Sequence, residues 1–247
     1  MNAFTRGIIL TIGLILLWES LVTLLQIPSY ILPSPVQVFK SWYTHRSLLI
    51  SEAITTITET FLGLMLGTLF GCITALSMAF FRPATLWLLP ILLISQAIPT
   101  FAIAPLLVIW LGYGMSSKIA TTILMLFFPI TSAFFDGLRR TELGWLDLAK
   151  TMQANKWSVF WHIRIPAALP SLASGLRVAT AIAPIGAIVG EWVGASKGLG
   201  YLMLNSNERM QIDLMFAALL TLIVFSLTLY FSMDKILRKL IPWQQEV

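Results

Sequence analysis

The sequence predicts an all-α integral membrane protein with six transmembrane helices. The chain of 247 residues is 57% hydrophobic and only 11% charged, and its mean hydropathy of +0.85 is far above that of a soluble globular domain. A helix that spans a bilayer needs about 20 mostly apolar residues. Six segments meet this requirement: 7–27, 57–81, 84–111, 117–135, 171–193 and 212–233. Their apolar runs are continuous, whereas the strands of a membrane β-barrel alternate between apolar and polar residues.

The N-terminal region, residues 1–56, is expected to form the first span and an external connector. Arg6 precedes the first apolar run, as in a signal peptide, but no small-residue cleavage site follows, so we expect the span to be retained. The proline-rich stretch 28–35 is predicted to be a rigid, non-helical connector. Residues 36–56 are more polar and are predicted to form a short amphipathic helix at the outer surface.

The remaining five spans are expected to form a core over residues 57–240. The third span is predicted to be kinked or broken, because it contains three prolines, Pro90, Pro99 and Pro105. The second span has a face of small residues formed by Gly63, Gly67 and Gly71. Such a face lets another helix approach closely, either within the chain or from a second copy.

The distribution of basic residues predicts that both termini and the loop 136–170 lie in the cytoplasm. With the N-terminus inside, the cytoplasmic segments hold ten of the 16 Lys and Arg residues, and Arg177, near the start of the fifth span, can extend to the same face as an eleventh. The five on the external side are Lys40, Arg46, Lys118, Lys197 and Arg209. The basic pI of 9.6 then reflects topology and anionic membrane lipid, not nucleic acid.

Cysteine and histidine usage argues against metal chemistry. The single cysteine, Cys72, excludes an intrachain disulfide and is expected to be a small packing residue. The two histidines, His45 and His162, do not form a metal-ligand pattern with it. We therefore expect no metal and no cofactor.

The loop 136–170 is the longest polar interruption of the core and is expected to contact a partner in water. Residues 142–152 are predicted to form a short helix, and Asn155 to cap a second one that runs to about Ile163. Pro166 and Pro170 are expected to end that helix and begin the fifth span. The predicted surface carries Trp145, Trp157, Phe160 and Trp161. Such aromatic residues suit a docking groove in another protein or, alternatively, the lipid headgroup zone.

The same loop resembles the EAA loop of binding-protein-dependent ABC transporter permeases. That family pattern is Glu-Ala-Ala, three residues, Gly, nine residues and Ile-x-Leu-Pro. Here Asp147-Leu-Ala149 is followed by Gln153 and then by Ile163-Arg-Ile-Pro166, without a gap. The main departure is Gln153, because the family glycine ends the first helix in a left-handed conformation. The turn is expected either to close differently here or to place Asn155 in that conformation.

The resemblance extends over nearly the whole chain and implies a type I ABC importer permease (MetI-like) fold. Further segments resemble the nitrate/sulfonate/taurine branch: Trp18-Glu19, Pro33-Ser-Pro35, 99–105, 110–112, 128–130, 166–170 and 198–200. Within that branch, Gly190-Glu-Trp-Val-Gly194 looks like permeases for hydroxymethylpyrimidine or related thiamine precursors such as formylaminopyrimidine. An importer for sulfonate, taurine or nitrate is the alternative.

The resemblance implies a multi-pass permease of the bacterial inner membrane that is not itself an enzyme. Its partners would be two cytoplasmic ATP-binding subunits, a second permease copy in a homodimer, and a periplasmic or lipid-anchored substrate-binding protein. The chain has no phosphate-binding Gly-x-x-x-x-Gly-Lys-Ser/Thr loop, so ATP hydrolysis would belong to the partner. The implied ATPase-coupling residues are Asp147, Leu148, Ala149, Gln153, Ala154, Asn155, Ile163, Ile165 and Pro166.

Two acids in apolar spans are candidate functional residues. Glu19 lies in the middle of the first span, where an ionised carboxylate is costly, and is expected to be paired structurally rather than to contact substrate. Glu191, followed by Trp192, is a candidate for the substrate pathway, with an acid solvated at the outer interface as the alternative. A competing enzyme class, an intramembrane serine hydrolase, rests on Gly194-Ala-Ser196-Lys-Gly198, but neither histidine is placed to serve as its base.

Overall fold

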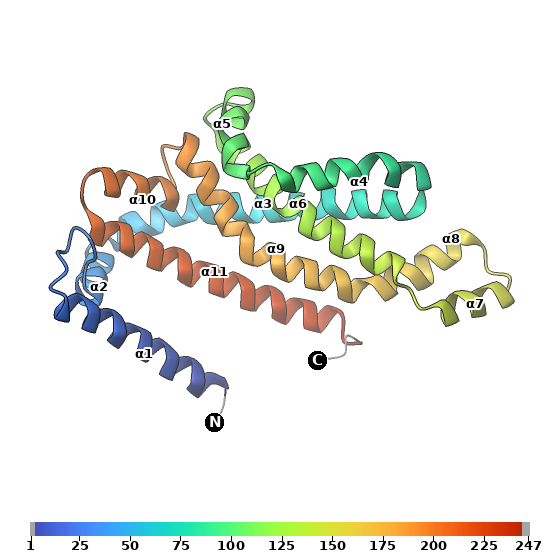
Figure 1. The fold of residues 1–247 in the computed structure, drawn as a ribbon, viewed down its shortest axis with the longest axis horizontal. Helices are drawn as coiled ribbons and strands as arrows, with labels where there is room; N and C mark the ends of the chain where they lie inside the picture. The colour runs from blue at the N-terminus through green and yellow to red at the C-terminus, as the bar shows by residue number, and fades with distance from the viewer. Residues whose placement is uncertain (1–2, 244–247) are drawn as a thin grey trace. The chain divides into compact units, whose positions relative to one another are not determined.

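The computed structural model describes residues 3–243, and the regular secondary structure in this range is entirely helical. Its elements are α1 (Ala3–Leu24), α2 (Pro35–Thr44), α3 (Arg46–Phe80), α4 (Arg82–Ala97), α5 (Thr100–Leu111), α6 (Met115–Arg139), α7 (Leu143–Thr151), α8 (Lys156–Val159), the π-helix η1 (Phe160–Arg164), α9 (Ile165–Gly194), α10 (Leu199–Glu208) and α11 (Ile212–Leu240) (Figure 1). Within this range, five helical stretches are long and apolar enough to span a membrane, and the bent pair α4–α5 gives a sixth. The prediction of an all-α fold with six spans is confirmed.

The helices form two compact units. One comprises Met1–Thr56 and Ser196–Val224, and the other Ile57–Ala195 and Phe225–Val247. In the first unit, α1 is apolar and largely exposed, as expected for a helix in lipid. The loop that begins α10 is held by α3, because Gly198 N–H donates to Glu52 Oε2 at 2.5 Å and Leu199 N–H donates to Thr56 Oγ1 at 2.8 Å.

The outer helix predicted over residues 36–56 is only partly correct. A helix does begin there: α2 starts at Pro35 and is capped by Ser34, whose hydroxyl accepts a hydrogen bond from Gln37 N–H while the Gln37 side chain accepts one from Ser34 N–H. It ends at Thr44, however, and the residues from Arg46 onward already belong to the 35-residue helix α3. The polar residues 46–56 extend a membrane helix instead of forming a separate one.

The third predicted span is broken, as its prolines indicate. The axes of α4 and α5 meet at an angle of 104°. Pro90 lies inside α4 and Pro105 inside α5, while Pro99 is the N-cap of α5. The bend follows the proline at the junction, because the residue before a proline is biased away from helical conformation and Ile98 is extended with φ −89° and ψ 121°.

Helix α6 is held closely between α3 and α9 by glycines on both neighbours. On α3, an added Cβ at Gly63, Gly67 or Gly71 would meet the side chain of Thr122, Leu126 or Ile130 of α6, respectively. On α9, an added Cβ at Gly186 would lie 2.9 Å from the Cα of Thr122. The glycine face of α3 therefore serves packing within the chain, which decides between the two alternatives left open by the sequence.

The far ends of α9 and α11 are joined by charged side chains. Arg177 of α9 donates from Nε to Asp234 Oδ1 of α11 at 2.7 Å, and Arg238 donates to the other oxygen of the same carboxylate at 2.8 Å. Arg177 and Asp234 are both mostly shielded from solvent. The ion pairs connect α11 to α9. They lie toward the ends of the two helices that are predicted to be cytoplasmic, on the same side as the loop 136–170, which we call the coupling loop.

Candidate functional site

The first arm of the loop 136–170 is the short helix α7, as predicted. Its apolar side chains are largely uncovered: Leu148 is 62% exposed and Met152, just after the helix, is 74% exposed. Ala149 is the buried exception at 4%. Asp147 lies on the opposite, solvated side, where its Oδ1 accepts a hydrogen bond from Lys150 Nζ at 2.8 Å. An exposed apolar face on a loop in water is typical of an interaction surface.

The turn after α7 is closed by Gln153 itself. Its φ of 55° places it in the left-handed region, and Gln153 N–H and Ala154 N–H donate to the carbonyls of Lys150 and Ala149, both at 2.9 Å. This pair of hydrogen bonds is the Schellman arrangement that usually has glycine at this position. Gln153 therefore adopts the left-handed conformation that the resemblance implies for a glycine at this position. Asn155 remains extended with φ −70°, so the expectation that it takes the left-handed position is wrong.

The second arm begins at Asn155, as predicted, but it does not stop at Pro166. The Asn155 side chain accepts a hydrogen bond from Ser158 N–H at 2.6 Å and so caps α8. The chain then passes through the π-helix η1 directly into α9, with Pro166 in the first turn of α9 and Pro170 within it. A proline in the first turn of a helix breaks no internal hydrogen bond. The wider turn of the π-helix η1 precedes this proline. It connects α8 to α9, so that the second arm is continuous.

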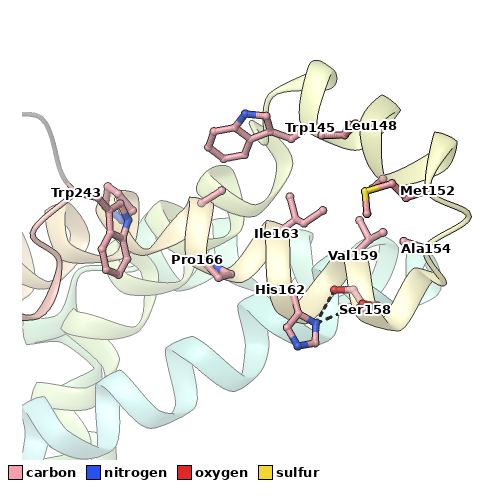
Figure 2. A pocket seen from close by; sticks show the side chains of 13 residues that line it. Trp145, Leu148, Met152, Ala154, Ser158, Val159, His162, Ile163, Pro166 and Trp243 are labelled. Carbon is pink, nitrogen blue, oxygen red and sulfur yellow. Dashed lines mark hydrogen bonds between the residues drawn. The ribbon is translucent and has the colours of Figure 1, made fainter.

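An apolar cavity of about 950 Å³ lies between the two arms (Figure 2). From α7 and its turn it is lined by Trp145, Leu148, Ala149, Met152 and Ala154. Ser158, Val159, His162, Ile163, Pro166, Ala167 and Pro170 line it from the second arm. Five of the nine predicted coupling residues thus meet at one groove: Leu148, Ala149, Ala154, Ile163 and Pro166.

The other four predicted residues shape the loop around this groove. Asp147 faces solvent, Gln153 and Asn155 form the turn, and half-buried Ile165 packs against the apolar core beneath the loop. One lining residue was not anticipated: Trp243, which follows the last helix and reaches the groove from a distant part of the sequence. No local spacing in the sequence relates Trp243 to the loop, so only the fold reveals it.

The aromatic residues of the second arm anchor the loop to α3. The ring centroids of Trp157 and Phe160 each lie 5.2 Å from that of Phe80, in edge-to-face geometry. Phe160 is 5% exposed and belongs to the core, so its predicted place on the surface is wrong. The rings of Trp157 and Trp161 contact each other in a tilted arrangement, with centroids 5.6 Å apart, and both side chains remain about half exposed. These contacts attach the loop to a transmembrane helix.

The two candidate pathway residues differ in their surroundings. Glu191 is 1% exposed and faces the interior of the core, whereas its neighbour Trp192 is 43% exposed. Lys118, which is expected on the external side, is also buried in α6, and its Nζ lies 3.3 Å from Glu59 Oε1. The pairing expected for Glu19 stays a prediction; its Oε2 is shielded and has no hydrogen-bond partner within residues 3–243.

The chain matches the family model "Binding-protein-dependent transport system inner membrane component" over residues 67–243. A "probable ABC transporter permease protein" of Haemophilus influenzae is 55% identical, with 92% of this chain and 93% of that protein covered. The formylaminopyrimidine transport permease protein ThiX of Halalkalibacterium halodurans is 35% identical over 94% of this chain and 93% of that protein. The riboflavin transport system permease protein RibX of Chloroflexus aurantiacus is 34% identical over 96% of this chain and 90% of that protein.

The fold is also that of a solved importer. The chain resembles the structure of the MetNI methionine ABC transporter in an inward-facing conformation, with a TM-score of 0.67 and 18% identity, over 79% of this chain and 97% of that one. The type I, MetI-like fold is thereby confirmed. The intramembrane serine hydrolase suggested by Gly194-Ala-Ser196-Lys-Gly198 is overturned, because the relatives that match more than nine-tenths of the chain are permeases.

Proposed function

Because this chain belongs to the family of binding-protein-dependent transport system inner membrane components and is therefore the permease subunit of an ABC importer, we propose that it carries a pyrimidine precursor of thiamine. Hydroxymethylpyrimidine and formylaminopyrimidine are the best candidates. A permease of this family is an inner-membrane protein that works with an ATP-binding subunit and a substrate-binding protein.

The observation that carries the substrate proposal is the similarity to the formylaminopyrimidine permease over 94% of the chain. The riboflavin permease is nearly as similar, and both named solutes are flat nitrogen heterocycles. A sulfonate, taurine or nitrate is the second candidate, but an anion in the pathway requires a cation or a helix N-terminus to receive it. The buried lysine of the core, Lys118, is already paired with Glu59 at 3.3 Å, which favours the uncharged heterocycle.

We assign the substrate-facing role at the end of α9 to Trp192. Its side chain is exposed and can stack on a pyrimidine ring. Its neighbour Glu191 is 1% exposed and lies inside the core. In the transporting assembly, this end of α9 would face the same segment of a second copy across the pathway.

The groove between the two arms of the coupling loop is proposed to receive the ATP-binding subunit. Leu148 and Met152 present apolar surface that a cytoplasmic partner can cover. Two such subunits would dock on the loops of a permease homodimer. When they close on ATP, the loops would move with them, and the aromatic contacts with Phe80 and the continuous helix from α8 to α9 would pass that motion to the spans. Alternating access follows if ATP binds one arrangement more tightly.

Uptake into proteoliposomes tests the substrate. The complete importer, reconstituted with its binding protein and ATP, should accumulate labelled hydroxymethylpyrimidine. Unlabelled formylaminopyrimidine should compete strongly, and riboflavin and taurine weakly. Accumulation of taurine or an alkanesulfonate in its place would contradict the proposal and establish the second candidate.

A matched pair of variants tests the docking surface. Leu148→Asp places a charge in the groove, whereas Leu143→Asp places it on the same helix at a position that is 75% exposed and does not line the groove. We expect Leu148→Asp to lose co-purification of the ATP-binding subunit and Leu143→Asp to retain most of it. Equal retention in both variants would show that the partner binds elsewhere.

A further inference from the structure

A polar cavity of about 550 Å³ lies between the end of α6, the start of α9 and the segment after α11. Its volume is within the range of about 300–1,000 Å³ that is usual for small-molecule sites. Unlike the apolar groove of the coupling loop, this cavity contains charged and hydroxyl side chains. They are Asp136 and Arg140 of α6 and Ser171 and Ser174 of α9, together with the indole of Trp243.

Two glycines bring α6 and α9 together beside this cavity. An added Cβ at Gly137 of α6 would lie 2.7 Å from the Cβ of Ser171, and one at Gly175 of α9 would lie 2.6 Å from the Cβ of Ala133. Because the two backbones approach so closely, polar side chains of both helices line one space. The cavity is therefore shaped by the packing of two transmembrane helices.

The two charged side chains of the cavity are free to bind a ligand. Asp136 and Arg140 are both exposed, and within residues 3–243 neither side chain forms an ion pair or a hydrogen bond. A carboxylate only accepts hydrogen bonds and a guanidinium group only donates them, whereas serine hydroxyls do both. Since the two charges cancel, the cavity suits a neutral ligand that carries its own donors and acceptors.

An aminopyrimidine matches these side chains. Its exocyclic amino group can donate to the Asp136 carboxylate, and its ring nitrogens can accept hydrogen bonds from the hydroxyls of Ser171 and Ser174. The ring can stack on the indole of Trp243, which is 54% exposed. A sulfonate would instead bring a second anion to the Asp136 carboxylate. The cavity therefore favours the solute class proposed above.

Trp243 connects this cavity with the groove of the coupling loop. Its side chain lines both spaces (Figure 2). A ligand that stacks on Trp243 therefore contacts a side chain of the groove that is proposed to receive the ATP-binding subunit. Both spaces also lie at helix ends that are predicted to be cytoplasmic, where the solute accumulates after import.

We propose that the polar cavity is a cytoplasmic binding site for the imported aminopyrimidine and that its occupation slows further import. This inference rests on the proposed solute. The serines of the site belong to the first turns of α9, whereas Trp192 lies at the other end of the same helix. The site thus responds to solute that has already crossed the membrane, and Trp243 passes its occupation to the coupling loop.

Proteoliposomes with ATP inside and the binding protein outside test the inference and the proposed function separately. The measurement is the initial uptake rate of labelled hydroxymethylpyrimidine, with and without unlabelled hydroxymethylpyrimidine enclosed in the vesicles. We expect the enclosed solute to slow uptake severalfold and enclosed taurine to have no effect. Uptake that enclosed hydroxymethylpyrimidine does not slow would overturn the inference and leave the proposed function intact. No uptake into vesicles without enclosed solute would overturn both.

Matched variants assign the effect to the cavity, with equilibrium dialysis of labelled hydroxymethylpyrimidine against the purified importer as a second readout. Asp136→Asn should weaken binding about tenfold, because a hydrogen bond to a charged group is lost, and should relieve the inhibition. Ser174→Ala, a milder change, should weaken binding about threefold. Glu142→Gln alters an exposed acid that does not line the cavity and should leave both readouts unchanged. Parental binding and inhibition in Asp136→Asn and Ser174→Ala would contradict the proposed site.

Discussion

Ala154 donates a backbone hydrogen bond of 2.9 Å to the carbonyl of Ala149, across the turn in which Gln153 has a φ of 55°. The hydrogen bond closes a turn that favours glycine, because a residue with a side chain is strained at a positive φ. Because the fold holds Gln153 in a left-handed conformation, this position stores a small amount of strain. The loop is thus ordered by its surroundings and not by local preference alone.

Replacing Gln153 by glycine should stabilise the loop by about 1 kcal/mol, because glycine adopts a positive φ without steric cost. Replacing it by valine should have the opposite effect, since a β-branched residue is strongly disfavoured there. Hydrogen exchange of the amides from 149 to 158 measures both changes. Met210, with a φ of 57° in the other unit, provides the control: Met210→Gly should leave exchange in the loop unaltered. Faster exchange in Gln153→Gly would show that the glutamine side chain is itself needed.

Removal of the Asn155 cap should destabilise the start of the second arm. Asn155→Ala loses the side-chain hydrogen bond to Ser158 N–H, of 2.6 Å, at a cost of about 1 kcal/mol. Asn155→Asp should retain this hydrogen bond, because the aspartate side chain also has an oxygen that can accept it. The expected outcome for alanine is increased proteolysis between residues 150 and 160 and a reduced ratio of transport to ATP hydrolysis. If aspartate and alanine behave alike, the cap does not hold the arm.

Added volume between α6 and α9 should be poorly tolerated. The Cβ introduced by Gly190→Ala would lie 2.9 Å from the Cα of Lys118, and backbone atoms cannot yield as a flexible side chain does. Overpacking of this kind costs about 1–3 kcal/mol, so we expect a lower thermal midpoint and less monodisperse protein. Gly13→Ala, in a transmembrane helix where nothing lies within 4 Å of the new Cβ, should behave like the parent. Equal midpoints for the two variants would refute the close approach of the helices.

Much of this architecture follows from local patterns in the sequence. Long apolar runs locate the spans, prolines locate the break between α4 and α5, and Asn155 marks the start of α8. These features depend on neighbours in the sequence, so periodicity and capping chemistry predict them. The continuous passage from η1 into α9 was missed, because a proline was taken to end a helix although it is accommodated in the first turn.

The features that escaped prediction depend on contacts between distant segments. Lys118 is counted on the external side from the sequence, yet Glu59, 59 positions earlier in the chain, pairs with it in the interior. Trp243 reaches the coupling groove from beyond the last helix. Phe160 is buried by Phe80 of α3, which no pattern within the loop reveals. Helical periodicity shows which face is apolar but not which partner covers it.

The central claim, that the loop 136–170 is driven by a separate ATPase, is tested most directly by substrate-stimulated ATP hydrolysis in the reconstituted importer. The measurement compares the parent with Ala149→Glu, which places a charge in the groove, and Asp147→Lys, which reverses the charge on the exposed side of α7. We predict that both variants insert into the membrane normally, that substrate no longer stimulates their ATP hydrolysis and that transport is lost. Stimulation equal to that of the parent in both variants would contradict the coupling role of the loop.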